Sequence, residues 1–83
     1  MNSRYDILEK GKKIFLVGIG GAGMSAIAQV LHGMGFEISG SDIKESRYTD
    51  VLEKEGVKIF IGHSRKNIKD YDVVVYSAAI PDS

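Results

Sequence analysis

The stretch Ile14-Phe-Leu-Val-Gly18-Ile-Gly20-Gly21-Ala-Gly23-Met24-Ser25 joins a short apolar run to the pattern Gly-x-Gly-x-x-Gly. The apolar run is long enough for a buried strand, and a helical pattern of apolar residues begins directly behind the glycines. Glycines let the backbone turn sharply and approach another group closely. The first N–H groups of a helix have no partner inside the helix, so they point out of its end. The stretch is therefore typical of a strand, loop and helix that together bind an anion.

A diphosphate fits such a junction best, because unpaired N–H groups and the helix dipole both favour negative charge. Gly20 and Gly21 are the expected points of close approach, whereas Gly23 is expected to allow contact between helix and strand. Met24 is interpreted first as a core residue. Ser25 either donates to a phosphate oxygen or satisfies the first helical turn. The candidate contacts to the diphosphate are Gly20, Gly21, Ala22, Gly23, Met24 and Ser25.

Strand-like and helix-like segments alternate along the rest of the chain. Strands are expected at 13–17, 36–41, 57–61 and 72–77, helices at 22–34 and 47–55, and one or two helical turns within 62–71. Residues 1–12 are either a leader or a short N-terminal helix. Because strand–helix–strand connections are right-handed, this order predicts a parallel sheet. We expect an α/β, Rossmann-like three-layer domain over residues 13–83, with a small sheet in the strand order 3-2-1-4.

The helical spacing also predicts which side chains face the core. Met24, Ile27, Ala28 and Leu31 are expected to face inward from the first helix, and Tyr48, Val51 and Leu52 from the second. Ser46 is the expected N-cap of the second helix. His32 lies off the apolar stripe and is expected to be solvated.

Two further loops follow strands at the same edge of the sheet, where ligands of open α/β folds bind. Asp42 lies 19 residues after Gly23 and is placed to accept hydrogen bonds from a ribose diol, the alternatives being a solvated acid or a helix cap. Ser41 is a candidate for framing the base. His63 is a ligand contact, or else a surface or capping histidine. The loop Ser77-Ala78-Ala79-Ile80 would border the phosphates from the other side. NAD, FAD and uridine nucleotides all carry a suitable diol, so these residues leave the nucleotide open.

Composition excludes several classes of protein. The chain has 83 residues, 43% of them hydrophobic, so it is sized for one small domain. Eleven basic and eleven acidic residues cancel without forming a like-charged block, which disfavours nucleic acid as a partner. No segment resembles a membrane span or a signal peptide. There is no cysteine, no phosphate loop of the Gly-x-x-x-x-Gly-Lys type and no catalytic or metal constellation. We expect a soluble cytoplasmic domain without catalytic residues, metal or cofactor of its own.

Four blocks of sequence resemble the N-terminal domain of the Mur ligase family of bacterial peptidoglycan synthesis. They are Phe15-Leu-Val-Gly-Ile-Gly-Gly-Ala-Gly-Met-Ser25, Gly40-Ser-Asp42, Ile59-Phe-Ile-Gly-His63 and Ser77-Ala-Ala-Ile-Pro81. The run Gly-Ile-Gly-Gly-Ala-Gly-Met-Ser is far more restrictive than the three-glycine pattern. The resemblance covers residues 13–83, and it is most specific to the members that add L-alanine to UDP-N-acetylmuramate.

The resemblance implies a substrate-anchoring domain excised from a three-domain, ATP-dependent ligase. Residues 20–25 would hold the UDP diphosphate through backbone N–H groups. Ser41 and Asp42 would face the uridine with His63 nearby, and residues 77–80 would close over the phosphates. ATP and Mg2+ would bind to the missing central and C-terminal domains, so the fragment alone would be inactive. The length agrees, because 83 residues form one mononucleotide-sized half of a dinucleotide fold.

Two other interpretations share the glycine loop. One is a regulatory NAD(H)-sensing module, which also has an acid after the second strand. The other is the sibling ligase that recycles murein tripeptide. Both usually depart from Gly-Ala-Gly-Met-Ser, so the motif favours the ligase that adds L-alanine.

Overall fold

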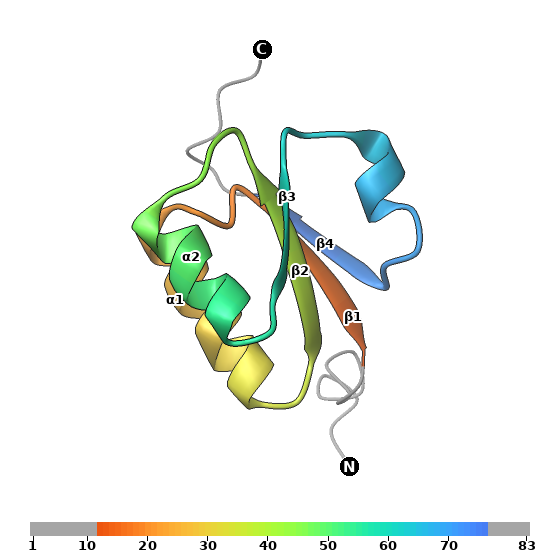
Figure 1. Ribbon diagram of the computed structural model, residues 1–83. Coiled ribbons are helices and arrows are strands. Elements are labelled where there is room, and N and C mark those ends of the chain that lie inside the picture. The colour runs from red at the N-terminus through yellow and green to blue at the C-terminus, as the bar shows by residue number, and fades with distance from the viewer. Residues whose placement is uncertain (1–11, 77–83) are drawn as a thin grey trace.

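The computed structural model of the chain describes residues 12–76 (Figure 1). In chain order, the elements are β1 (Lys13–Val17), α1 (Ala22–Gly33), β2 (Glu37–Asp42), α2 (Arg47–Lys54), β3 (Lys58–Ile61), the 3-10 helix η2 (Arg65–Ile68) and β4 (Val73–Tyr76). Within the described range, the expected ends agree with the observed ones or differ by a single residue. Of the expected leader or helix at 1–12, all but Lys12 lies outside the described residues.

The four strands form one parallel sheet in the order β3-β2-β1-β4, which confirms the predicted topology. Helices α1 and α2 lie together on one side of the sheet, and η2 lies on the other, so the domain has three layers (Figure 1). Val17 at the end of β1 pairs with Ser41 of β2 and with Tyr76 of β4. The carboxyl ends of the strands therefore meet at one edge. No helix among residues 12–76 has the length and apolar character needed to cross a membrane.

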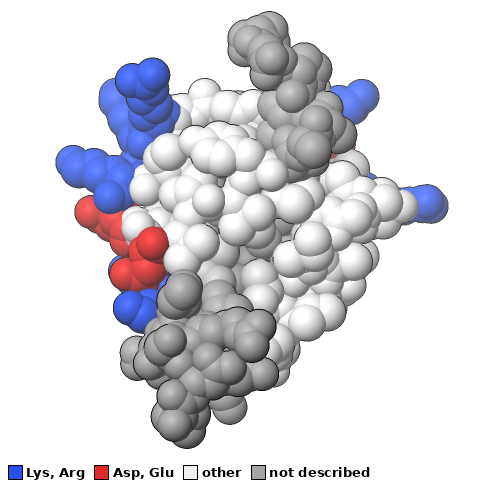
Figure 2. Space-filling model, turned by 180° about the vertical axis from the view of Figure 1, so that it is seen from behind, with Lys and Arg blue, Asp and Glu red and all other residues white. Residues whose placement is uncertain are grey.

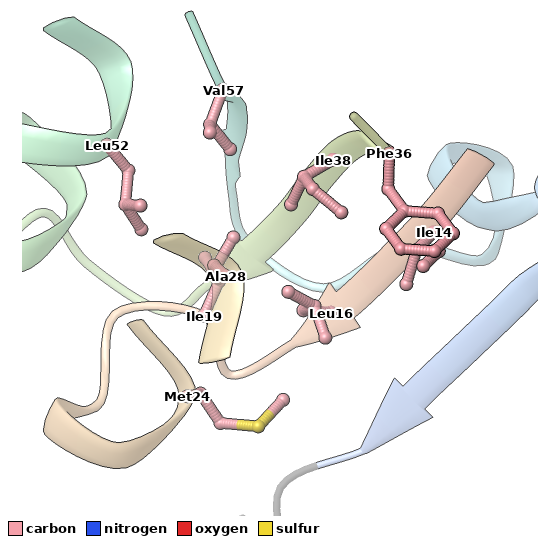
Figure 3. Close-up of a cluster of buried hydrophobic side chains, with 9 residues drawn as sticks. All are labelled: Ile14, Leu16, Ile19, Met24, Ala28, Phe36, Ile38, Leu52 and Val57. Atoms are coloured by element: carbon pink, nitrogen blue, oxygen red, sulfur yellow. The ribbon is translucent and has the colours of Figure 1, made fainter. Parts of the chain in front are cut away.

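The main core lies between the sheet and the two α-helices (Figure 3). Ile14 and Leu16 of β1 face Met24 and Ala28 of α1 there, and Leu52 closes the core from α2. On the opposite face of β1, Phe15 is 1% exposed, because the ring of Tyr71 packs against it edge-on at 5.0 Å. The run of apolar residues in β1 thus reflects a strand covered on both faces, as its sequence indicates.

Two predictions about helix faces are wrong. Ile27 is 48% exposed and Val51 is 45% exposed, whereas Thr49 and Leu52 are fully buried in α2. Helix α1 is apolar around much of its circumference, so the spacing alone did not fix its rotation on the sheet. Its outer flank leaves Ile27, Val30 and Met34 exposed. Because α1 and β4 contain no Lys, Arg, Asp or Glu, charged side chains are sparse on the side of the molecule that carries them (Figure 2).

His32 joins the ends of the two α-helices instead of being fully solvated as expected. Its Nε2 donates to the carbonyl oxygen of Glu55, the C-cap residue of α2, at 2.8 Å. Its Nδ1 is buried and has no hydrogen-bond partner among the described residues. The last carbonyls of a helix have no partner within the helix, so this contact satisfies one of them.

His32→Ala is expected to lower the free energy of unfolding by about 1 kcal/mol, because the Glu55 carbonyl loses its donor. Urea denaturation followed by circular dichroism measures the change. Gln29→Ala is the matched control on the same helix. Its amide bonds the exposed Glu55 carboxylate at 3.2 Å, and we expect its loss to have less than half the effect. Equal effects of the two substitutions would contradict a specific role for His32.

Candidate functional site

The glycine loop between β1 and α1 folds back on the end of β2. Gly18 has a φ of 89°, which favours glycine, and its N–H donates to the carbonyl oxygen of Ser41 at 2.8 Å. The N–H of Ile19 donates to the same oxygen at 3.0 Å, and the Ile19 side chain is fully buried. The N–H of Gly21 donates to the Gly18 carbonyl at 3.1 Å. These three N–H groups therefore shape the loop, so they are occupied before any ligand binds.

Gly20 is in close contact with Asp42 and Thr49, and its approach to a ligand stays a prediction. Its N–H donates to Oδ2 of Asp42 at 2.8 Å. A Cβ at this position would lie 2.8 Å from Asp42 Oδ2 and 3.0 Å from Cγ2 of Thr49. Gly20 is thus packed closely between Asp42 at the end of β2 and Thr49 of α2.

The first turn of α1 presents N–H groups that no described residue accepts. Gly21 is the N-cap and has no side chain to cap the helix. The N–H groups of Ala22, Gly23 and Met24 therefore point out of the helix, and the first turn contains no acidic residue. This geometry suits an anion, because N–H groups and the helix dipole act at the same point.

Gly23 does not serve the helix–strand contact that its place in the pattern indicated. Apart from its chain neighbours and the backbone of its own helix, a Cβ there would meet no described atom within 4 Å. Met24 has its side chain in the core, at 8% exposed, which leaves only its N–H for a ligand. Ser25 is buried, and its hydroxyl donates to the Ala22 carbonyl at 3.0 Å, so it satisfies the first turn.

Asp42 ties the loop after β2 to the glycine loop. Its Oδ2 accepts from Gly20, and its Oδ1 accepts from the N–H of Ile43 at 2.8 Å. Each carboxylate oxygen has a second lone pair, and the side chain is only partly buried. Asp42 is therefore able to accept a further hydrogen bond from a ligand while it holds the loop.

The side chains of Ser41 and His63 lie at the same edge of the sheet as Asp42, but on the face that η2 covers. The hydroxyl of Ser41 and Nδ1 of His63 are hydrogen-bonded at 2.7 Å, and the N–H of Gly62 donates to the Asp42 carbonyl at 2.7 Å. A cavity of about 150 Å³ adjoins this pair. Its lining residues are Phe15, Val17, Ser41, His63, Ser64, Arg65, Ile68 and Tyr76. The structure thus brings together two groups of predicted residues, one with Asp42 on the α-helix side and one with Ser41 on the η2 side.

The remaining predicted contacts, Ser77, Ala78, Ala79 and Ile80, lie outside the described residues. A larger hollow of about 510 Å³ lies over the amino-terminal half of the sheet, where Lys13, Glu37 and Lys58 contribute to its lining. No residue of the glycine loop lines it, so it is separate from the candidate site.

Two residues that shape the site were missed or only partly recognised in the sequence. A Cβ on Gly40 would lie 2.5 Å from the Leu16 carbonyl oxygen and 2.6 Å from Cδ1 of Ile19, so the glycine loop packs directly on Gly40. Ser46 is the N-cap of α2, as expected, and forms a capping box with Thr49. Its hydroxyl also donates to the Gly20 carbonyl at 3.4 Å. The capping box has a sequence signature, but the contacts of Gly40 and Ser46 with the loop have none.

Comparison with known proteins assigns the family. The model described as "Mur ligase family, catalytic domain" matches residues 13–83, which is most of the chain. The chain belongs to the Mur ligase family. The resemblance seen in the four sequence blocks is thereby confirmed, and so is the expected α/β fold.

The similar proteins carry the names of two kinds of ligase. The UDP-N-acetylmuramate–L-alanine ligase of Clostridium perfringens is 54% identical over 78 residues, which is 93% of this chain and 17% of that protein. The protein of the same name from Aquifex aeolicus is 53% identical over 76 residues, 90% of this chain and 17% of that protein. A crystal structure of a murein peptide ligase from Psychrobacter arcticus superimposes with a TM-score of 0.75 at 30% identity, covering 88% of this chain and 16% of that one. The chain thus spans only about a sixth of these relatives.

Proposed function

We propose that this chain is the part of a UDP-N-acetylmuramate–L-alanine ligase that anchors the UDP end of the substrate. The observation that carries the proposal is the first turn of α1, where the N–H groups of Ala22, Gly23 and Met24 have no described acceptor. The open space beside Gly23 leaves room for a diphosphate at these groups. The identity of 54% to a ligase of that name supports the choice of substrate.

The uridine is assigned to the loops after β2 and β3. Asp42 accepts from the ribose diol with the lone pairs that Gly20 and Ile43 leave free. The base extends toward the Ser41–His63 pair, which lies beyond the end of β2. Residues 77–80 are assigned as further contacts to the phosphates. These assignments keep every contact at the carboxyl ends of the strands, where open α/β sheets bind ligands.

The catalytic steps are assigned to the other domains of the longer ligase. That protein binds ATP and Mg2+ in its central domain and L-alanine in its C-terminal domain, and it acts in the bacterial cytoplasm. The matching model is described as a catalytic domain, yet this chain covers only 17% of the Clostridium relative. Residues 13–83 then form an anchoring unit that is inactive when isolated.

A second candidate is the murein peptide ligase, which is favoured by the structural match to the Psychrobacter protein. The sequence identity to that protein is 30%, against 54% to the Clostridium L-alanine ligase. The difference favours the L-alanine ligase. Activity of the full-length protein with L-alanine, compared with a peptide carrying the same amino-terminal residue, separates the two.

A nuclear magnetic resonance titration tests the proposed function. We expect UDP-N-acetylmuramate to shift the amide signals of Ala22, Gly23 and Met24, because a bound phosphate accepts from their N–H groups. NADH serves as the comparison ligand and is expected to produce smaller shifts at the same concentration. A stronger response to NADH would favour a nicotinamide-sensing module. No response to either ligand at millimolar concentration would contradict nucleotide anchoring by this chain.

A further inference from the structure

The backbone of Gly20 is held at both its N–H and its carbonyl, by Asp42 at the end of β2 and by Ser46 at the start of α2. Its N–H donates to the Asp42 carboxylate, and its carbonyl oxygen accepts from the Ser46 hydroxyl. We propose that Asp42 and Ser46 are positioning residues, which fix the glycine loop and thereby aim the first turn of α1 at the diphosphate. This inference rests on the proposed function and gives Asp42 a role that is independent of the ribose.

Asp42 provides the stronger of the two contacts. The distance from the Gly20 nitrogen to Oδ2 is 2.8 Å, and the acceptor is charged. The carboxylate of Asp42 is held in place by the N–H of Ile43, which donates to Oδ1. The backbone carbonyl of Asp42 accepts from the N–H of Gly62. Asp42 is therefore hydrogen-bonded to Gly62, the residue that follows β3. Through Asp42, the glycine loop after β1 is linked to the end of β3, which lies beyond β2 in the sheet.

Ser46 connects the loop to the start of α2. Its hydroxyl accepts from the Thr49 N–H at 3.3 Å and donates to the Gly20 carbonyl at 3.4 Å. Thr49 returns two bonds to Ser46, because its hydroxyl accepts from the Ser46 N–H at 2.9 Å and donates to the Ser46 carbonyl at 2.8 Å. Thr49 is fully buried, and its methyl group would lie 3.0 Å from a Cβ on Gly20. The helix cap and the loop are thus one packed unit.

This arrangement couples ligand binding to the α2 cap. Gly21 directly follows Gly20 and is the N-cap of α1. Movement of Gly20 would therefore change the direction of the free N–H groups in the first turn of α1. Pre-organised donors bind more tightly than donors that must first be ordered. We call the contacts of Asp42 and Ser46 with Gly20 the clamp. Loosening the clamp is therefore expected to weaken the binding of every ligand that contacts the first turn of α1, whether or not the ligand has a ribose.

Amide hydrogen exchange in the ligand-free protein tests the clamp directly. Asp42→Ala is expected to speed exchange at Gly20 by about tenfold relative to Gly23, whose N–H has no described acceptor. The ratio of the two rates removes the general effect of the lost charge. An unchanged ratio would overturn the role of Asp42 in the loop, whatever the protein binds.

Two ligands separate positioning from ribose contact. UDP carries the ribose diol, whereas 2′,3′-dideoxy-UDP lacks both hydroxyls. If Asp42 positions the loop, Asp42→Ala raises the Kd of 2′,3′-dideoxy-UDP by about tenfold, and the Kd of UDP by at least as much because the proposed ribose contact is lost as well. If only UDP binding weakens, Asp42 acts through the ribose alone and the inference is wrong. If the unsubstituted protein binds neither ligand, the proposed function fails, but the exchange measurement still decides whether the clamp exists.

Substitutions at Ser46 separate positioning from helix capping. Ser46→Gly retains most of the capping free energy but removes the hydroxyl, so we expect faster Gly20 exchange and weaker binding of both ligands without unfolding. Ser46→Thr restores the hydroxyl and is expected to rescue both measurements. Asp72→Ala is the control, since it breaks a comparable side-chain bond to the Lys13 N–H at the opposite end of the sheet. A Ser46→Gly protein with unchanged Gly20 exchange and Kd would remove Ser46 from the clamp.

Discussion

Gly40→Ala is expected to lower the free energy of unfolding by about 3 kcal/mol. The added Cβ would lie 2.5 Å from the Leu16 carbonyl oxygen and 2.7 Å from the Cβ of Ile19. Neither obstacle is the end of a flexible side chain, because Leu16 belongs to the central strand and Ile19 is fully buried in the loop. The backbones of β1 and β2 would have to separate. A small domain has a total stability of only about 5 kcal/mol or somewhat more, so the loss would be large.

Gly33→Ala provides the matched control for Gly40→Ala. Gly33 is the last residue of α1, and a Cβ there would meet no described atom within 4 Å. Alanine favours the helical conformation more than glycine does. The substitution is therefore expected to raise the free energy of unfolding by about 0.5–1 kcal/mol. Urea denaturation of both proteins gives the two changes. A Gly40→Ala protein as stable as the parent would show that β1 and β2 are not in the contact described here.

Gly23→Asp is expected to weaken UDP binding by about a hundredfold while the domain stays folded. The new side chain enters open space at the first turn of α1, where a carboxylate stabilises the helix by about 0.3–1 kcal/mol. The same carboxylate competes with the diphosphate for the free N–H groups and repels it. Charge-assisted hydrogen bonds contribute about 1.5–3 kcal/mol, which sets the size of the loss. Stability and binding should therefore change in opposite directions.

Isothermal titration calorimetry with UDP, together with thermal unfolding, measures both effects of Gly23→Asp. The control is Gly23→Ala, which adds a methyl group but no charge and keeps the N–H. We expect it to bind UDP within about tenfold of the parent. If Gly23→Asp bound UDP as tightly as Gly23→Ala does, the diphosphate would not lie at the first turn of α1.

The strands, their order and the cap of α2 could be predicted from sequence because each depends on local patterns. The apolar run of β1 indicates a strand covered on both faces, and Ser46 precedes a helical pattern. The rotation of α1 could not be predicted in this way. Ile27 and Met24 both fit a helical stripe, and only the packing of α1 on the sheet leaves the first exposed and the second buried.

The candidate site could be located from sequence, but the use of its residues could not. The glycine pattern predicts a loop and a helix start, and it assigned helix–strand packing to Gly23, whereas in the structure Gly20 is the packed glycine and Gly23 has open space beside it. The packing of Gly20 depends on Asp42 of β2 and Thr49 of α2, which lie outside the glycine loop. Such contacts are set by how the strands align side by side, and spacing along the chain carries no record of that alignment.

The last strand joins the sheet from far along the polypeptide. Lys13 and Asp72, which flank the start of the β1–β4 pairing, are 59 residues apart, whereas every other strand pairs with its neighbour in sequence order. Closing a long segment costs more chain entropy than closing a short one. The valines of β4 are only partly buried, and Val73 and Val75 pack against the edge of the core. β4 is an edge strand, so its release would uncover one side of β1 and leave the pairing of β1, β2 and β3 intact.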